Sequence, residues 1–236
     1  MTAFAILRIQ KHSSLASLAG VARHHSRQSR ARGCDPEKSP RNLSFGAACS
    51  GSAGVVAAVG RVIEQAQAKQ SKAFRRDAVK AVEFMFTASP EWWKTASPKY
   101  RSAFFDRARR WLREKHPGGV VAEWVHLDER SPHLHAVVVP LHEGRLNARH
   151  FFGGAKKLEA LQDEFASLMQ PLGLVRGVRG SDAPHLPVSA WWSALDRPPE
   201  PVKRSDYLRK SMGLPAPALE AMPAAYPLLT AVTFTL

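Results

Sequence analysis

The sequence predicts an α+β fold, in which helices pack on a central antiparallel sheet. Apolar side chains alternate with period two in some segments and recur at helical spacing in others. Two Val-rich segments are separated only by residues 128–132, which suffices for a hairpin and is too short for a parallel crossover. The chain has 236 residues, enough for one domain with its own core and a short appendage.

The N-terminal part of the chain predicts one strand and two helices. Residues 3–10 are short, apolar and rich in branched side chains, as in a strand. The polar, basic stretch that follows predicts a helix around residues 16–30 and then a loop containing Gly33 and Pro36. Apolar side chains at helical spacing predict a second helix over residues 54–70.

The middle of the chain predicts a half-buried strand followed by an amphipathic helix. Phe84 and Phe86 alternate with Glu83, which is the period of a strand with one buried face. Ser97 is a good N-cap for a helix that begins with Pro98. The apolar face of this helix is flanked by four arginines that either solvate it or bind phosphates: Arg107, Arg109, Arg110 and Arg113.

Two strands and one helix complete the predicted domain. Residues 120–127 and 133–140 form the hairpin, and a helix is expected over residues 155–169. From residue 183 the chain is Pro-rich without a sustained period. We therefore expect a domain over residues 1–182 and a poorly ordered, truncated-looking tail over residues 183–236.

The charge of the chain favours a polyanionic partner. Lys and Arg number 34 against 20 Asp and Glu, for a net charge of +14. Nucleic acid is the first candidate, an acidic membrane surface the second, and a basic bias of the source proteome the uninformative alternative. Cys34 and Cys49 form no CxxC pair, and no segment reads as a signal peptide or a bilayer span, so we expect a cytoplasmic protein.

Three histidines of the hairpin predict an open metal site. His133 and His135 share a face because strand side chains alternate, and His126 joins them if it lies opposite either one. Three imidazoles on one side of a divalent cation leave positions free for water or substrate. Of the turn residues Asp128 and Glu129, one is expected to orient an imidazole and the other to act as a general base, with the assignment open.

This hairpin resembles the metal motif of the Mob/Pre plasmid mobilisation relaxases, the plasmid recombination enzymes. Further segments that resemble the family stand in the expected order: residues 7–11 with 22–27, residues 35–42, residues 76–83 and residues 144–149. The resemblance implies the palm fold shared by relaxases and rolling-circle (HUH-like) initiators. It also implies a metal-dependent endonuclease that cuts one strand at a plasmid origin of transfer and stays attached to the 5′ phosphate.

The resemblance also implies roles for particular residues. His24 takes the position of a histidine nucleophile three residues before Arg27, although His25 also stands close. Arg27 is expected to neutralise phosphate charge or hold the attacking group, and Glu129 is expected to accept a proton. The metal would be Mn²⁺ or Mg²⁺, whereas three imidazoles alone suit zinc, copper or iron as well. The partner would be plasmid DNA, and a homodimer is possible. Expected DNA contacts are Arg23, His25, Arg30 and Arg76.

Two other functions remain open. One is a catalytically inactive DNA-binding remnant of the same fold, motivated by the unusual tail. The other is a metal-dependent hydrolase of a small phosphorylated substrate, which explains the charge less well. The scarcity of tyrosine argues against a tyrosine nucleophile, because none stands near the N-terminal motif: Tyr100, Tyr207 and Tyr226.

Overall fold

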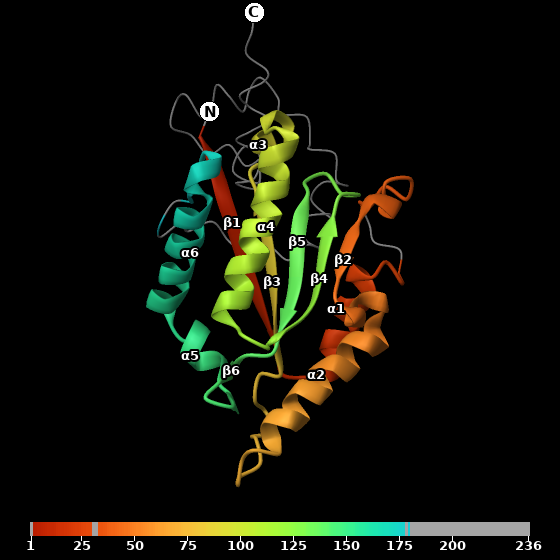
Figure 1. Cartoon of the computed structure of the whole chain (residues 1–236), viewed down its shortest axis with the longest axis vertical. Helices are drawn as coiled ribbons and strands as arrows, with labels where there is room; N and C mark the ends of the chain where they lie inside the picture. The colour runs from red at the N-terminus through yellow and green to blue at the C-terminus, as the bar shows by residue number, and fades with distance from the viewer. Residues whose placement is uncertain (1, 30–32, 178, 180–236) are drawn as a thin grey trace, which may run out of the picture. The chain divides into compact units, whose positions relative to one another are not determined.

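The computed structural model describes residues 2–29, 33–177 and 179. Its main feature is a six-stranded sheet in the order β2-β4-β5-β3-β1-β8 (Figure 1). The five strands from β2 to β1 pair antiparallel, and β8 is added in parallel to β1. The expected α+β class and antiparallel sheet are confirmed. The strands are β1 Ala3–His12, β2 Leu43–Phe45, β3 Ala81–Ala88, β4 Val120–His126, β5 His133–Val138 and β8 Leu174–Arg176, and a small separate ladder joins β6 Leu141–His142 and β7 Arg145–Leu146.

Helices cover the two faces of the sheet unequally. The longest described helix, α4, crosses one face together with α6, while α1 and α2 lie against part of the other face (Figure 1). The helices are α1 Leu15–His25, α2 Ser52–Gln67, α3 Pro90–Thr95, α4 Pro98–Lys115, α5 Ala148–Phe152 and α6 Ala155–Met169, and three short 3₁₀ turns are η1 Ser39–Arg41, η2 Ala47–Ser50 and η3 Gln170–Leu172.

The alternation along β3 decides what each face carries. Phe84 and Phe86 are fully buried and face an aromatic core that includes Phe104 and Phe165. Glu83 points the other way, because adjacent side chains on a strand face opposite sides. The carboxylate of Glu83 therefore lies on the face of the sheet that α1 and α2 partly cover.

Two tryptophans of α3, an element that the sequence did not predict, belong to the aromatic core. Trp92 and Trp93 are buried, and their indole nitrogens donate to the Leu172 carbonyl at 2.9 Å and to Thr87 Oγ1 at 3.1 Å. Burial with satisfied donors is the ordinary state of a core tryptophan. Neither side chain is therefore presented as a platform for unpaired bases.

The first helix is shorter than expected. The helix predicted over residues 16–30 ends at His25, and Arg27 has a left-handed φ of 56°. The basic residues after His25 have the spacing of a helix, but Arg27 leaves the helix and pairs with Asp128 and Glu129 of the β4–β5 turn. Tertiary ion pairing overrides local propensity here.

Arginines of α4 bind the protein itself. Arg109 and Arg113 both contact the buried Glu123 of β4, and the Arg109 guanidinium also lies 3.4 Å from the Phe45 ring centroid. These two arginines attach α4 to the edge of the sheet rather than forming a free basic face. None of the described helices combines the length and the apolar character that a membrane crossing requires.

Candidate active site

The β4–β5 hairpin brings its three histidines together. His126 pairs directly with His133, so both lie on the face that also carries His135. Ring centroids are 5.0 Å apart for His126 and His133, 5.3 Å for His126 and His135, and 4.8 Å for His133 and His135. The sequence required His126 to lie opposite His133 or His135 for the three side chains to share a face, and the structure pairs it with His133.

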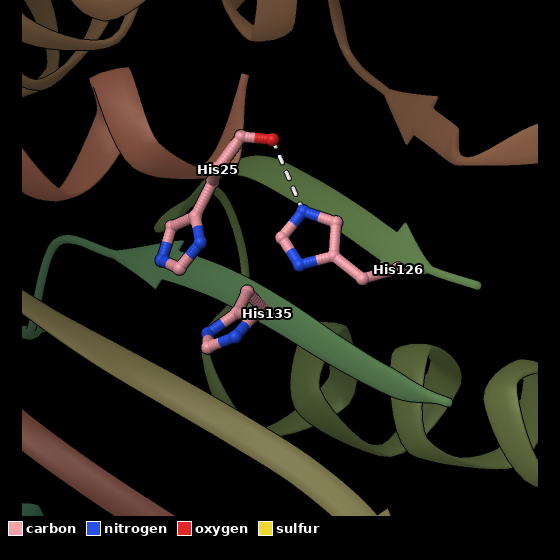
Figure 2. Close-up of side chains that lie close together, drawn as sticks. All are labelled: His25, His126 and His135. Atoms are coloured by element: carbon pink, nitrogen blue, oxygen red, sulfur yellow. Dashed lines mark hydrogen bonds between the residues drawn. The ribbon is translucent and has the colours of Figure 1, made fainter. Parts of the chain in front are cut away.

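Two of these imidazoles present lone pairs to each other. His126 Nε2 lies 3.0 Å from the His25 carbonyl (Figure 2), and His133 Nδ1 lies 2.8 Å from the Ser131 carbonyl. A carbonyl only accepts, so in the neutral form of each ring the proton lies on the nitrogen that faces the carbonyl and the opposite nitrogen is unprotonated. The two unprotonated atoms, His126 Nδ1 and His133 Nε2, are 3.2 Å apart. Facing lone pairs repel unless a cation lies between them, so this donor set fits a metal ion.

Glu83, on the neighbouring strand β3, orients the imidazole of His135. Its Oε1 lies 2.9 Å from His135 Nδ1 and 2.8 Å from His25 Nε2, and its Oε2 lies 3.6 Å from His12 Nε2. Burial would raise the pKa of this carboxyl, but the hydrogen bonds with His12, His135 and His25 outweigh it and lower the pKa. A carboxylate behind one ring nitrogen leaves the other free for a metal, a common arrangement at such sites.

The turn residues have separate roles. Glu129 Oε1 lies 3.8 Å from His126 Nδ1 and 3.7 Å from His133 Nε2, so it faces the histidines. Asp128 is buried beneath the turn and binds Arg27 and Ser39 instead. The sequence left this assignment open, and the geometry places Glu129, rather than Asp128, beside the imidazoles.

Arg27 ties the N-terminal motif to the hairpin. Its guanidinium donates to both Asp128 oxygens at 3.0 and 2.6 Å and to Glu129 Oε1 at 2.8 Å. It also donates to the His24 carbonyl at 3.3 Å. Burial would raise the pKa of Asp128, but the hydrogen bonds from Arg27 and Ser39 outweigh it and lower the pKa. Arg27 is thus an ion-paired clamp whose charge is already balanced.

The adjacent histidines of α1 occupy different environments. His25 is buried and stacks on His135 with ring centroids 3.8 Å apart, and burial lowers its pKa to about 4. His24 is half-buried, with its ring centroid 6.4 Å from that of His126. Burial and then the Arg27 charge lower the pKa of His24. His24 is therefore a neutral, partly accessible imidazole at the rim of the cluster, whereas His25 is part of its floor.

Two groups of side chains have ligand atoms close enough to share an ion at the cluster. One is His126, Glu129 and His133, and the other is His25, His126 and His135, drawn in Figure 2. In each group the ligand atoms lie within 4.8 Å of one another. His25 was expected as a DNA contact, and the structure instead places it against the expected metal ligands.

The remaining expected DNA contacts are scattered. Arg23 is exposed on the last turn of α1, beside His24. Arg76 precedes β3, whose start pairs with the end of β5, so it lies toward the end of the sheet away from the hairpin turn. Arg30 lies outside the described residues.

Glu83 and His12 were missed as site residues by reasoning from the sequence. A carboxylate in the middle of an otherwise apolar strand was the available signal for Glu83, because a buried charge requires partners. His12 carried no comparable signal, since a single histidine at the end of a strand has no spacing that marks it as part of a site.

The architecture defines a relaxase-type domain. The MobM relaxase domain, solved with Mn and a 22-nucleotide origin-of-transfer DNA of plasmid pMV158, superposes with a TM-score of 0.72 at 24% identity, covering 81% of this chain and 99% of that one. Another MobM structure, with a 23-nucleotide DNA, gives a TM-score of 0.68 at 25% identity, covering 83% and 100%.

Sequence comparison identifies the family. The model of the plasmid recombination enzymes (Mob_Pre) matches residues 1–192, and the chain belongs to that family. A 65 kDa protein of Zymomonas mobilis is 32% identical over 200 residues, which are 84% of this chain and 34% of that protein. A plasmid recombination enzyme of a Bacillus species is 30% identical over 192 residues, covering 79% and 45%. The chain therefore spans less than half the length of these curated relatives.

Proposed function

We propose that this protein nicks one strand of plasmid DNA at an origin of transfer and becomes attached to the 5′ phosphate. The observation that carries the proposal is the position of His24, a neutral imidazole at the rim of a cluster of metal-binding side chains. A neutral imidazole has a lone pair for attack on phosphorus. The family's solved relaxase domain, with Mn and origin DNA bound, supports the same substrate.

The hairpin histidines would hold the metal. His126, His133 and His135 would supply three nitrogens, a set that Mn²⁺ accepts more readily than Mg²⁺, which prefers oxygen ligands. When bound, the ion polarises a non-bridging oxygen of the scissile phosphate and stabilises the charge that develops in the transition state. Glu83 keeps His135 in the orientation that ligation needs.

The bond changes involve His24 and the DNA. The His24 nitrogen forms a bond to phosphorus and the bond from phosphorus to the 3′ oxygen breaks. The proton that the His24 ring loses passes through Glu129 to that oxygen, which leaves as a 3′ hydroxyl. Because the phosphoester energy is kept in the covalent link, rejoining needs no nucleotide cofactor. Glu129 is ionised and is therefore able to accept the proton that the His24 ring loses.

A part of the sheet that the described helices do not cover would offer the DNA an approach to this site. Arg8 pairs with Met85, and Met85 pairs with His135, so the three side chains form one row on the same face. Arg8 is exposed and makes no side-chain hydrogen bond within the described part of the chain. Its charge is available to a phosphate, whereas the charge of Arg27 is not.

The test is a nicking assay with supercoiled DNA carrying a candidate origin and Mn²⁺. We expect a nicked circle with protein attached to the 5′ end. His24→Ala should abolish attachment while Mn²⁺ binding is retained, and His25→Ala should lower Mn²⁺ affinity. A nick without attachment would contradict the covalent step, and full activity of His24→Ala would contradict the choice of nucleophile. DNA binding without a nick under any metal would leave a catalytically inactive DNA-binding protein.

A further inference from the structure

The turn that carries Glu129 is not held by the sheet. The ladder between β4 and β5 ends at the pair of His126 and His133, so the residues between these two histidines lie outside it. Leu127 and Asp128 form the link from His126 to Glu129. A segment outside a ladder keeps one position only where other contacts hold it. The position of Glu129 beside the histidines therefore depends on what binds Leu127 and Asp128.

The segment that precedes β2 supplies these contacts. The backbone N–H of Asp35 donates to the Asp128 carbonyl at 2.7 Å, and Ser39 Oγ donates to Asp128 Oδ2 at 2.7 Å. The side-chain oxygen of Asn42 accepts from the Leu127 N–H, also at 2.7 Å. Both residues of the link are thus bound by hydrogen bonds of good length from one stretch of chain.

This stretch has few conformations of its own. The Asp35 carbonyl accepts from the backbone N–H groups of Lys38 and Ser39 at 3.0 and 3.1 Å. Pro36 and Pro40 restrict φ at two more positions. A segment that is already ordered loses little entropy when it binds the turn, so it can serve as a support.

The position of Glu129 matters to an ion at the site because of its charge. Its Oε1 lies 3.8 Å from His126 Nδ1 and 3.7 Å from His133 Nε2, the two nitrogens whose lone pairs face each other. A divalent ion between these nitrogens would be close to the carboxylate even without a direct bond to it. Their attraction weakens as the distance grows. A displaced Glu129 would therefore lower the affinity for the ion.

We propose that Ser39 and Asn42 are positioning residues of the metal site, which hold Glu129 beside the His126–His133 pair through the two turn residues that precede it. The inference rests on the metal site of the proposed function and deepens it, because it assigns a role to two side chains that act through the turn. Arg27 binds the same turn but also reaches the His24 carbonyl, so its loss would not isolate this role.

The experiment is a double-mutant cycle on Mn²⁺ affinity, measured by electron paramagnetic resonance on the full chain without DNA. Its variants are Asn42→Ala, Glu129→Gln and the two together. Asn42→Ala alone should lower Mn²⁺ affinity about fivefold, because the carboxylate is no longer held near the ion. In the Glu129→Gln background the same substitution should lower it by less than about twofold, since the charge that Asn42 positions is already gone.

Ser39 provides an independent series. Ser39→Ala removes the donor to Asp128 and should also lower Mn²⁺ affinity, whereas Ser39→Thr keeps the hydroxyl and should restore it. Ser50→Ala is the matched control, because Ser50 is an exposed serine of another 3₁₀ turn and donates only to the Ala47 carbonyl at 3.5 Å. Thermal unfolding of each variant shows that it is folded at the temperature of the titration.

An equal loss of Mn²⁺ affinity from Asn42→Ala in both backgrounds would overturn the inference. So would unchanged affinity in Glu129→Gln, or wild-type affinity in both Asn42→Ala and Ser39→Ala. A protein that nicks DNA normally while the cycle shows no coupling would refute the positioning role and leave the proposed function intact. Coupling in a protein that never nicks DNA would do the reverse, and a wild type that binds no Mn²⁺ would refute the metal site and the inference together.

Discussion

Glu83 shows how one buried side chain organises the candidate site. It is largely buried, so little water reaches its charge, and it lies against His12, His25 and His135. A buried carboxylate is stable only when hydrogen bonds replace its water. The ring orientations of two histidines are thus fixed by a residue that need not touch the metal.

Replacing Glu83 by Gln tests this positioning role. The amide keeps the shape and loses the charge, so His135 is held less firmly, and we expect Mn²⁺ affinity to fall about tenfold. Mn²⁺ titration by electron paramagnetic resonance measures this. Glu64→Gln, on the exposed side of α2, is the control. Equal Mn²⁺ affinity for both variants would remove Glu83 from the site.

Arg27 should matter for stability as well as for chemistry. Its loss leaves the fully buried Asp128 without its main partner, and breaking such a pair costs about 3 kcal/mol. We therefore expect Arg27→Ala to lower the free energy of unfolding in denaturant by about this amount. Arg75→Ala removes the same kind of bidentate contact, but with the exposed Asp77, and should leave the free energy of unfolding unchanged. Similar effects of both substitutions would contradict the difference in burial.

At the scale of elements, the sequence predicted the hairpin best. Parity along β4 and β5 follows from strand geometry alone, and the turn between them has few alternatives. The end of α1 could not be predicted in the same way, because it depends on the Arg27 contacts with a turn more than 100 residues away. The parallel addition of β8 and the buried α3 likewise depend on packing that no local period reveals.

A buried histidine at the end of α4 should make the stability of the fold depend on pH. His116 lies among Phe84, Phe151 and Phe152, and burial lowers its pKa to about 4 from 6.5. The folded state therefore keeps the ring neutral where the unfolded state protonates it. Its contribution to stability is present above pH 6.5 and is lost as the pH falls toward 4.

His116→Phe should flatten the pH dependence of unfolding in that window. The shifted pKa of His116 corresponds to about 3 kcal/mol in the free energy of unfolding. As the pH falls from 7 toward 4, the wild type should therefore lose about this much more free energy of unfolding than the variant loses. Chemical denaturation at pH 7 and pH 4.5 measures it. Parallel curves for the wild type and the variant would show that His116 is not the group responsible.

At the scale of the whole molecule, only part of the positive charge is free to bind a partner. Of the four arginines on α4 that the sequence offered as a phosphate-binding face, two, Arg109 and Arg113, are bound to Glu123. Composition predicted a polyanionic partner and could not say which charges remain free. That distinction depends on tertiary ion pairs, which the sequence does not show.

The position of basic residues relative to the hairpin predicts different salt effects. Arg23 is exposed next to His24, whereas Arg76 lies toward the other end of the sheet. If the single strand passes the histidine cluster, Arg23→Ala should reduce the slope of log affinity against log salt by about 0.7. Arg76→Ala should leave the slope unchanged. Fluorescence anisotropy with a labelled origin strand measures both, and a larger effect of Arg76→Ala would reverse the proposed path.

The bond from His126 Nε2 to the His25 carbonyl has a consequence for biosynthesis. It joins residues 101 positions apart, and the Arg27 contacts with Asp128 span the same distance. At roughly 5–20 residues per second, the ribosome takes about 5–20 s to make the intervening chain. During that interval the nascent N-terminal histidines have no partners from the hairpin. A growing chain therefore cannot hold His126 and Asp128 in their finished orientation until the hairpin has been made and has reached the end of α1.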